Sequence, residues 1–250
     1  MSAHVAGRKY DALGLDPLVI AYCQRSGATD RRTISAWFKS ARSLGLTTNL
    51  VGAWVFGAGR NAGTGTTAFD LTNNRYDLTL NNGPTWGASS LDFVRASSQT
   101  AAITNAASGG AFNVGSSKLF TVSAWLKCTS SSAQTYAIYK GASGWGVYDI
   151  FASYRFSKPG YGQVVSGAAT DGDWYHIAAG WDGENSWISL NNAEKLTVGN
   201  LGSADTTDDF SIGGFSGSYW GGSIDEVMFW NRALTDAERT WIYNGGVKRI

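Results

Sequence analysis

The chain has 250 residues, with 20 basic and 19 acidic side chains and a formal net charge of +1. This balance argues against a protein that coats nucleic acid, because binding to phosphates needs a net basic face. No run approaches the ~18 consecutive apolar residues of a membrane-spanning helix, and residues 1–14 lack the apolar core of a signal peptide. Cys23 and Cys128 exclude a disulfide framework, although one bridge between them is conceivable.

The charges are unevenly distributed along the chain. Residues 1–47 carry seven Lys or Arg against three Asp, whereas the remainder carries 13 basic against 16 acidic side chains. This asymmetry predicts two units, a small basic segment over residues 1–47 and a mildly acidic body over residues 48–250.

The first predicted elements are two helices. One starts at Asp16-Pro17, a favourable N-cap and first helical position, and ends at Gly27, a favourable C-cap. The other extends from Asp30 to Leu44, and its apolar stripe consists of Ile34, Trp37, Phe38, Ala41 and Leu44. Two short amphipathic helices bury little surface by themselves. The hairpin is therefore predicted either to decorate the body or to anchor the protein to a partner through Trp37 and Phe38.

Residues 10–50 also resemble short segments in structural proteins of tailed-phage virions. The shared pattern is D-P-x-V-x-A-[YF], followed by G-A-T-D-x-x-x-I-S-A and, further on, L-G-L. In those proteins similar helical stretches precede a β-sandwich. The resemblance implies a protein of the extracellular virion that docks on other virion proteins or on copies of itself.

From Leu50 onward the apolar spacing changes to that of strands. Short stretches rich in aromatic and β-branched residues alternate in polarity, as in TVSAWLK over residues 121–127. Turn signals such as Asn81-Asn82-Gly83-Pro84 and Asp171-Gly172 separate them. Strands at this spacing, without helices between them, predict a two-sheet antiparallel sandwich.

One helix is predicted at the end of the body. Thr235 and Glu238 form a T-x-x-E capping box, which favours a short helix that carries Trp241 and ends at Gly245. We expect Trp241 to pack as a lid on the sandwich.

The ordered motifs of residues 50–246 resemble the laminin-G-like, concanavalin-A-like lectin/glucanase domain. The closing motif I-D-E-V-x-x-[WY]-N-R-A-L-[TS]-x-x-E begins at Ile224, and the hairpin W-x-H-[IV]-A-x-x-W-D-G begins at Trp174. Two departures are Asn192, where a turn glycine is common, and Trp220, where Phe or Tyr is usual. The resemblance implies a mainly β jelly-roll sandwich, here preceded by the helical hairpin and closed by the short C-terminal helix.

The carboxylates do not show the pattern of an enzyme of this fold. Retaining glucanases carry E-x-D-x-E on one strand, which places the carboxylates on one face. This sequence has no such triple, and Asp225 and Glu226 are adjacent, so that on a regular strand they point to opposite faces. Asp171, Asp173, Asp208 and Asp209 lie in turn-like segments, where solvated loop carboxylates are expected.

The two histidines give no better basis for catalysis. His4 lies near the N-terminus, and His176 lies in a predicted strand, where a packed or hydrogen-bonded role is expected. Two histidines are too few candidates for a zinc site or a Ser-His-Asp triad. We therefore expect the protein not to be an enzyme.

A calcium site is one of two alternatives for the loop from Asp70 to Asp77. Hard cations prefer several oxygen ligands, which Asp70, Asn73, Asn74 and Asp77 offer within eight residues. Laminin-G-like relatives often hold a structural Ca²⁺ between this loop and the Asp of the closing motif, here Asp225. The resemblance thus implies Asp70, Asn74 and Asp225 as ligands, and the alternative is an Asx-rich turn without metal.

Glycan binding needs aromatic faces that stack on sugar C–H surfaces beside amides and carboxylates. Six aromatic residues lie in or beside glycine-rich connections, where loops often carry function: Trp145, Tyr148, Tyr154, Tyr161, Tyr219 and Trp220. We single out Trp145, which lies between two glycines, with Tyr148 and Tyr161. The alternative at each position is a core residue.

These observations favour a non-enzymatic virion protein, of the capsid decoration or fibre type. It would attach through residues 1–47 and display a lectin-like sandwich that adheres to surfaces or cell-surface glycans. The first alternative is a free-standing carbohydrate-binding lectin, with or without calcium dependence. A glycoside hydrolase is the second.

Overall fold

The computed structural model of the protein describes residues 43–57, 61, 63–115, 118–158, 162–202 and 205–244. The predicted helical hairpin, with Trp37 and Phe38, lies outside these residues except for its last two positions. Within the described ranges, no helix has the length and apolar character that crossing a membrane requires.

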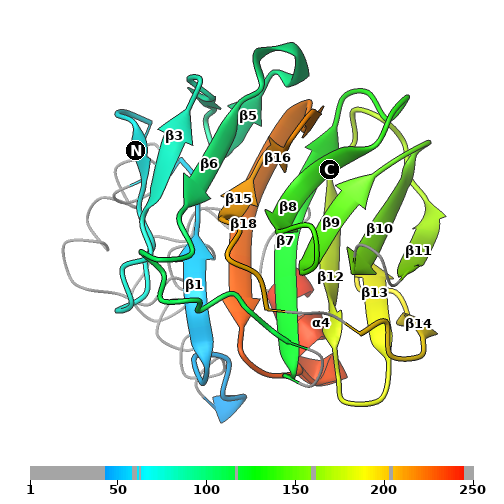
Figure 1. Ribbon diagram of the computed structural model, residues 1–250. Helices are drawn as coiled ribbons and strands as arrows, with labels where there is room; N and C mark the ends of the chain where they lie inside the picture. Colours follow the sequence, from blue (N-terminus) through cyan, green and yellow to red (C-terminus); the bar gives the residue numbers. More distant parts are fainter. Residues whose placement is uncertain are drawn as a thin grey trace.

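Two antiparallel sheets form a sandwich, which confirms the predicted architecture (Figure 1). Sheet A consists, in spatial order, of β14 (Leu196–Val198), β13 (Ser186–Leu190), β12 (Tyr175–Trp181), β7 (Phe120–Cys128), β18 (Gly222–Trp230), β5 (Leu91–Phe93) and β4 (Thr85–Trp86), and β1 (Leu50–Trp54) also pairs with β18. Sheet B consists of β11 (Gly162–Ala168), β10 (Ser153–Lys158), β9 (Trp145–Asp149), β8 (Thr135–Lys140), β15 (Phe210–Ile212), β6 (Thr100–Ile103), β3 (Leu78–Asn81) and β2 (Thr67–Ala68).

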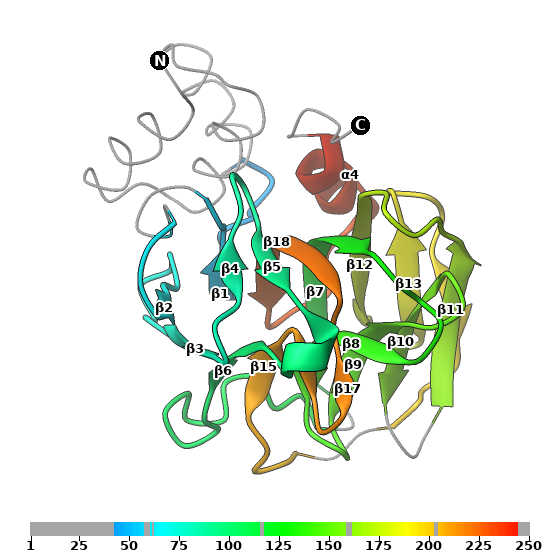
Figure 2. The same cartoon turned by 90° about the horizontal axis from the view of Figure 1, so that it is seen from above.

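Three smaller elements complete the described chain. A hairpin of β16 (Gly214–Phe215) and β17 (Ser218–Tyr219) follows β15, and a 3-10 helix, η2 (Arg95–Ser97), precedes β6. The helix α4 (Asp236–Asn244) covers the outer face of sheet A, on the side away from sheet B (Figure 2).

Strand β7 shows how the sequence pattern produces the sandwich. Val122, Ala124 and Leu126 point into the core between the sheets, as the period-two alternation predicts. Ser123 and Trp125 lie on the other face, yet they too are buried. Trp125 stacks on Tyr243 of α4 with ring centroids 5.9 Å apart. The helix therefore turns the outer face of sheet A into a second packed layer.

His176 and the carboxylates of β18 take structural positions in this layer. His176 is buried, and its Nε2 lies 2.8 Å from the Ser123 hydroxyl oxygen, as expected for a packed strand histidine. The pairing of β18 with β7 shifts between Asp225 and Met228, where Glu226 has a φ of 50°. Because the strand bulges there, the strict alternation expected for Asp225 and Glu226 is interrupted. Cys128, at the end of β7, is a buried free thiol.

The C-terminal helix begins at the predicted capping box. The Thr235 amide donates to Glu238 Oε2 at 2.8 Å, and the Glu238 amide donates to Thr235 Oγ1 at 3.3 Å. Arg232 binds both Glu238 oxygens, at 2.9 and 2.6 Å, and also donates to the carbonyls of Gly45 and Thr48. Trp241 packs on the apolar cluster beneath the helix, as predicted for a lid.

Candidate functional site

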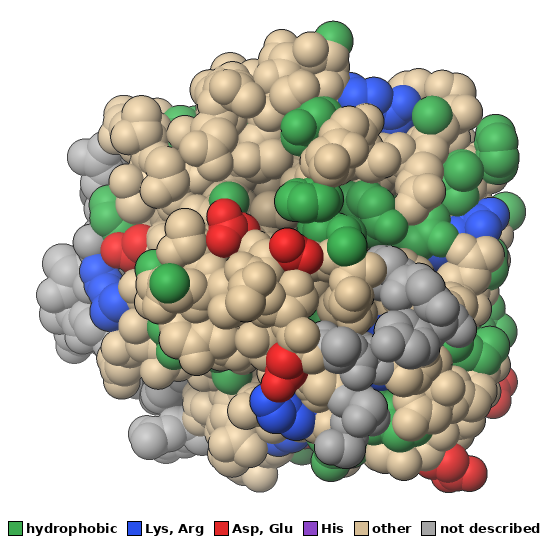
Figure 3. All heavy atoms as spheres, in the orientation of Figure 1, with side chains coloured by type: hydrophobic (Ala, Val, Ile, Leu, Met, Phe, Trp, Pro, Cys, Tyr) green, Lys and Arg blue, Asp and Glu red, His purple; other side chains and the backbone are tan. Residues whose placement is uncertain are grey.

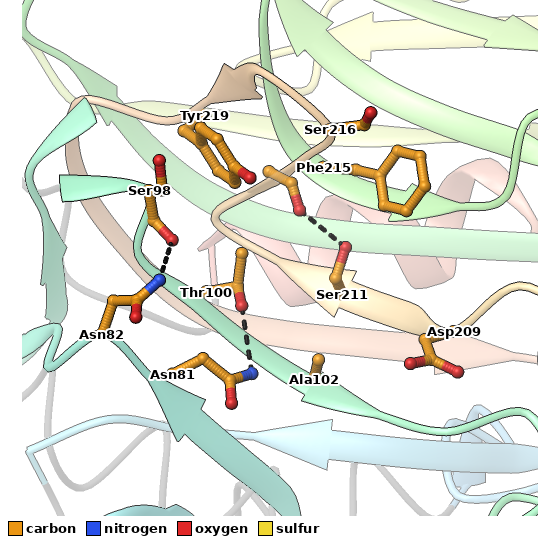
Figure 4. A pocket seen from close by; sticks show the side chains of 11 residues that line it. Asn81, Asn82, Ser98, Thr100, Ala102, Asp209, Ser211, Phe215, Ser216 and Tyr219 are labelled. Atoms are coloured by element: carbon orange, nitrogen blue, oxygen red, sulfur yellow. Dashed lines mark hydrogen bonds between the residues drawn. The ribbon is translucent and has the colours of Figure 1, made fainter. Parts of the chain in front are cut away.

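A hollow of about 370 Å³ opens on the outer face of sheet B, beside the β16–β17 hairpin (Figure 4). Its floor consists of short side chains from three strands: Asn81 of β3, Thr100 and Ala102 of β6, and Ser211 of β15. In the sheet register, Asn81 pairs with Thr100, and Ala102 pairs with Ser211. Paired residues of adjacent antiparallel strands point to the same face. Because all four are short, the surface dips here.

The β16–β17 hairpin forms a wall of the hollow and contributes Phe215 and Tyr219. Its two-residue turn has φ of 44° at Ser216 and 90° at Gly217, the left-handed pair that tight hairpins require. Position 214 requires glycine, because a Cβ there would lie 2.5 Å from the Tyr219 Cα. The local sequence therefore fixes the backbone that carries both aromatic rings.

Phe215 is held by a row of aromatic rings on sheet B. It stacks on Tyr139 at a centroid distance of 4.6 Å, and Tyr139 contacts Tyr136 at 4.7 Å. Tyr136 in turn contacts Tyr148 at 5.1 Å. Tyr139 and Tyr148 are buried within this row, whereas Phe215 is 36% exposed. In Figure 3 a band of hydrophobic side chains crosses the middle of this face, next to acidic groups.

The polar groups of the hollow offer both acceptors and donors. Asn82 Nδ2 donates to the Ser98 carbonyl at 2.8 Å, and Asn81 Nδ2 donates to Thr100 Oγ1 at 3.2 Å (Figure 4). The Ser211 hydroxyl donates to the Gly214 carbonyl at 2.8 Å. The amide oxygens of Asn81 and Asn82 accept no hydrogen bond from the described residues and can accept one from a ligand. The hydroxyls of Ser98, Thr100, Ser216 and Tyr219 also line the hollow and can donate one.

Asp209 is the charged side chain of the hollow. Its Oδ1 accepts a hydrogen bond from the Asn105 amide at 3.2 Å, and the side chain is exposed. Behind it, the buried Lys140 donates to Asn105 Oδ1 at 3.1 Å, to the Thr206 carbonyl at 3.3 Å and to the Asp208 carbonyl. Burial lowers the pKa of Lys140, and the nearby Asp208 and Asp209 partly offset this. Lys140 therefore positions the Asp209 segment without reaching the hollow.

Of the three predicted glycan-binding residues, Trp145 and Tyr148 do not line this site. Trp145 is 0% exposed, and its indole N–H donates to the Phe112 carbonyl at 3.1 Å, so its face cannot meet a ligand. The flanking glycines serve close packing, because a Cβ at Gly144 would lie 1.8 Å from the Lys140 carbonyl oxygen. Tyr148 is buried and donates its hydroxyl to Gln163. Tyr161 lies outside the described residues.

Among the other aromatic residues that the sequence marks, Tyr219 lines the hollow. Tyr154 and Trp220 belong to the core. Phe215 was not identified from the sequence, although F-S-G-S-Y, two aromatic residues around a Ser-Gly turn, signals an exposed hairpin. From the sequence, Asn81 and Asn82 were predicted only to form a turn, and Asp209 was predicted only to be a solvated loop carboxylate.

Asp70 and Asn74, two of the three predicted calcium ligands, make hydrogen bonds within the protein. Both oxygens of the buried Asp70 are used: Oδ1 accepts from the amides of Ala53 and Thr72, and Oδ2 from the Thr72 hydroxyl and the Tyr76 amide. Two donors per oxygen occupy the usual acceptor positions of a carboxylate. Asn74 turns its amide N–H₂ to the Val51 carbonyl at 2.8 Å.

The third predicted ligand, Asp225, is also hydrogen-bonded within the protein. Its Oδ1 accepts hydrogen bonds from the amides of Phe56 and Glu226, both at 2.7 Å. No group of three or more His, Cys, Asp or Glu that could hold a metal ion occurs in the described part of the chain. The hydrogen bonds of Asp70 are those of an Asx-rich turn, and calcium binding by Asp70, Asn74 and Asp225 stays a prediction.

A family model, described as the concanavalin A-like lectin/glucanases superfamily, matches residues 96–238. No curated protein gives a significant match. Among solved structures, a Trypanosoma rangeli sialidase in complex with the inhibitor DANA is similar at a TM-score of 0.61 and 13% identity, over 85% of this chain and 38% of that one.

Two toxin domains are similar to the same degree. The binding domain of Paraclostridial Mosquitocidal Protein 1 has a TM-score of 0.59 and 13% identity, over 80% of this chain and 52% of that one. The binding domain of Botulinum Neurotoxin DC in complex with SialylT has a TM-score of 0.58 and 13% identity, with the same coverage of 80% and 52%. The chain thus spans about half or less of each of these three structures, and identities this low show the shared fold alone.

Proposed function

The chain belongs to the concanavalin A-like lectin/glucanases superfamily, and from this premise we propose that it binds carbohydrate in the hollow of sheet B. The juxtaposition of the exposed Phe215 ring with the free amide oxygens of Asn81 and Asn82 carries the proposal. An aromatic ring can stack on the C–H face of a pyranose, while amide oxygens accept hydrogen bonds from its hydroxyls. The similar toxin domain in complex with SialylT lends support at the level of the fold.

The hollow is shallow and solvent-exposed, so binding of a single sugar is expected to be weak. A site with one stacking ring and a few hydrogen bonds corresponds to a Kd on the order of 0.1–1 mM, or about −4 to −5.5 kcal/mol. Display of several copies on one particle raises the effective affinity, which suits adhesion.

We propose a binding role rather than hydrolysis. Glycoside hydrolases use two carboxyl groups that flank the scissile bond. Among the residues of the hollow that the structure describes, Asp209 is the single carboxylate. Its neighbour Asp208 is engaged elsewhere, because its Oδ2 accepts from the Ala142 amide and the Thr206 hydroxyl, both at 2.9 Å. A lone carboxylate can orient a sugar but cannot serve as the acid and the base of hydrolysis.

Replacing Phe215 by Ala should weaken binding of the preferred oligosaccharide, selected on a glycan array, by at least about 10-fold, because the stacking surface is lost. Tyr219→Phe should keep most of the affinity and Tyr219→Ala should not. Titration calorimetry measures each Kd. Phe151→Ala is the matched control, since Phe151 is 70% exposed and does not line the hollow. Unchanged binding by Phe215→Ala and Tyr219→Ala, or no glycan bound by the wild type, would refute the proposal.

The site of action that we propose is the surface of a phage virion, with the sandwich displayed and residues 1–47 attached to the particle. This rests on the resemblance of residues 10–50 and on the basic charge of that segment. Residues 45 and 46, which lead into the sandwich, are fixed to it by two hydrogen bonds. Trp230 donates its indole N–H to the Leu46 carbonyl at 2.7 Å, and Arg232 donates to the Gly45 carbonyl. The alternative is a free-standing lectin.

Attachment is tested with the double variant Trp37→Ala/Phe38→Ala in the full chain. We expect the wild-type protein to cosediment with purified virions and the double variant to remain in the supernatant, while both bind glycan equally. The Phe151→Ala variant should cosediment normally. A wild-type protein that never cosediments with virions but binds glycan would favour the free-standing lectin.

A further inference from the structure

We propose that the hollow selects neutral glycans and rejects sugars that carry a carboxylate, such as sialic acid; the inference rests on the proposed carbohydrate binding. It follows from the sign of the charge in the hollow.

The charge of the hollow is negative. Among the described residues that line it, Asp209 is the one that carries a full charge, and none is Lys or Arg. Asp208, the residue before Asp209, lies in the same loop, and its carboxylate accepts a hydrogen bond from the Ala142 amide. A carboxylate bound about 5 Å from Asp209, in surroundings that are partly water, would be disfavoured roughly 10-fold by like-charge repulsion.

The buried Lys140 offsets this charge only in part, because Asp208 and Asp205 lie near it as well. Lys140 is fully buried, and its ammonium group donates three hydrogen bonds, to Asn105, Thr206 and Asp208. Arg95, at the start of η2, donates to the Ser130 carbonyl and does not line the hollow. Neither side chain is positioned to bind an incoming carboxylate.

The open hydrogen-bonding groups include both acceptors and donors. The amide oxygens of Asn81 and Asn82 and Asp209 Oδ2 can accept from a sugar hydroxyl, and the hydroxyls of Ser98, Thr100, Ser216 and Tyr219 also line the hollow and can donate. Neutral, hydroxyl-rich sugars can use both kinds of group. The discrimination against an ionised carboxylate therefore comes from the charge of Asp209 and from the lack of a cation among the described residues that line the hollow.

The test compares matched oligosaccharide pairs that differ only in a terminal sialic acid, on an array and by calorimetry. For the wild type, we expect the neutral member to bind at least about 10-fold more tightly. Asp209→Asn should reduce this ratio toward unity, and Asp209→Lys should reverse it. Raising NaCl from 0.05 to 0.5 M should also reduce the wild-type ratio, because exposed charges are screened. Phe151→Ala, away from the hollow, should keep the full ratio.

The outcomes separate this inference from the proposed function. Tighter or equal binding of the sialylated members overturns the selection for neutral glycans and leaves carbohydrate binding intact. A ratio that Asp209→Asn and Asp209→Lys leave unchanged also overturns it, because the carboxylate would then not set the preference. Absence of binding to every member refutes the proposed function, and the inference with it.

Discussion

Replacement of Asp70 by Ala is expected to lower the free energy of unfolding by about 3–5 kcal/mol. Asp70 is fully buried and accepts four hydrogen bonds at 2.7–3.0 Å, which join β1 to the loop that follows β2. Alanine leaves the amides of Ala53, Thr72 and Tyr76 without their acceptor. Each buried donor without a partner costs on the order of 1 kcal/mol or more.

Denaturant unfolding at pH 7 measures the change, with Asn73→Ala as the matched control from the same loop. Asn73 is exposed, so its substitution should stay within about 0.5 kcal/mol of the wild type. Because hydrogen bonds rather than a cation satisfy Asp70, the wild-type stability should not change with a chelator or with added Ca²⁺. A chelator-sensitive stability that Asp70→Ala abolishes would instead restore the predicted calcium site.

Replacement of Lys158 by Met should raise the free energy of unfolding at pH 7 by about 2–3 kcal/mol. Lys158 is 0% exposed, and its ammonium nitrogen has no hydrogen-bond partner among the described residues. It lies 5.2 Å from the centroid of the Trp181 ring, which offsets part of the desolvation. Methionine has a similar volume and no charge, so it removes the cost and keeps the packing.

The same lysine predicts a pH dependence. Burial lowers the pKa of Lys158 from its ordinary value of 10.5 to about 8 in the folded protein. Between these two values the unfolded chain binds more protons, so the wild-type stability should gain as pH rises from 8 toward 10.5. Below pH 8 the lysine is charged in both states, and its full cost is present.

Lys158→Met should lack this gain, and urea titrations at pH 7, 8, 9 and 10 compare the two proteins. Lys127→Met, at a half-buried position on β7, is the control and should follow the wild type. If Lys158→Met is less stable than the wild type at pH 7, the buried ammonium group is compensated and the explanation is wrong.

The sandwich could be predicted because the sequence patterns that specify its strands and helix involve residues close together in the chain. Period-two alternation identifies β7, and the T-x-x-E motif places the N-cap of α4 at Thr235, where the reciprocal hydrogen bonds are found. The same local reasoning failed at Trp145. Its two flanking glycines resemble those of a loop, yet Gly144 is there because the Lys140 carbonyl leaves no room for a Cβ.

The hollow could not be predicted because it depends on register. Asn81, Thr100 and Ser211 belong to strands far apart in sequence, and only the pairing of β3, β6 and β15 brings their short side chains to one face. The aromatic wall depends on a hairpin whose tight turn is visible in the sequence, but its position over this face is not. Calcium was inferred from oxygen-rich composition, whereas the oxygens of Asp70 accept hydrogen bonds from backbone amides and a hydroxyl.

The central claim is that sugar binds in the hollow of sheet B. The most direct measurement is amide chemical-shift mapping of the labelled protein, titrated with the neutral oligosaccharide that binds most tightly on the array. Saturable shifts should concentrate at Asn82, Thr100, Ser211 and Phe215, on the hollow and its aromatic wall. Shifts confined to other surfaces, such as the α4 face or the turn at Phe151, would contradict the assignment.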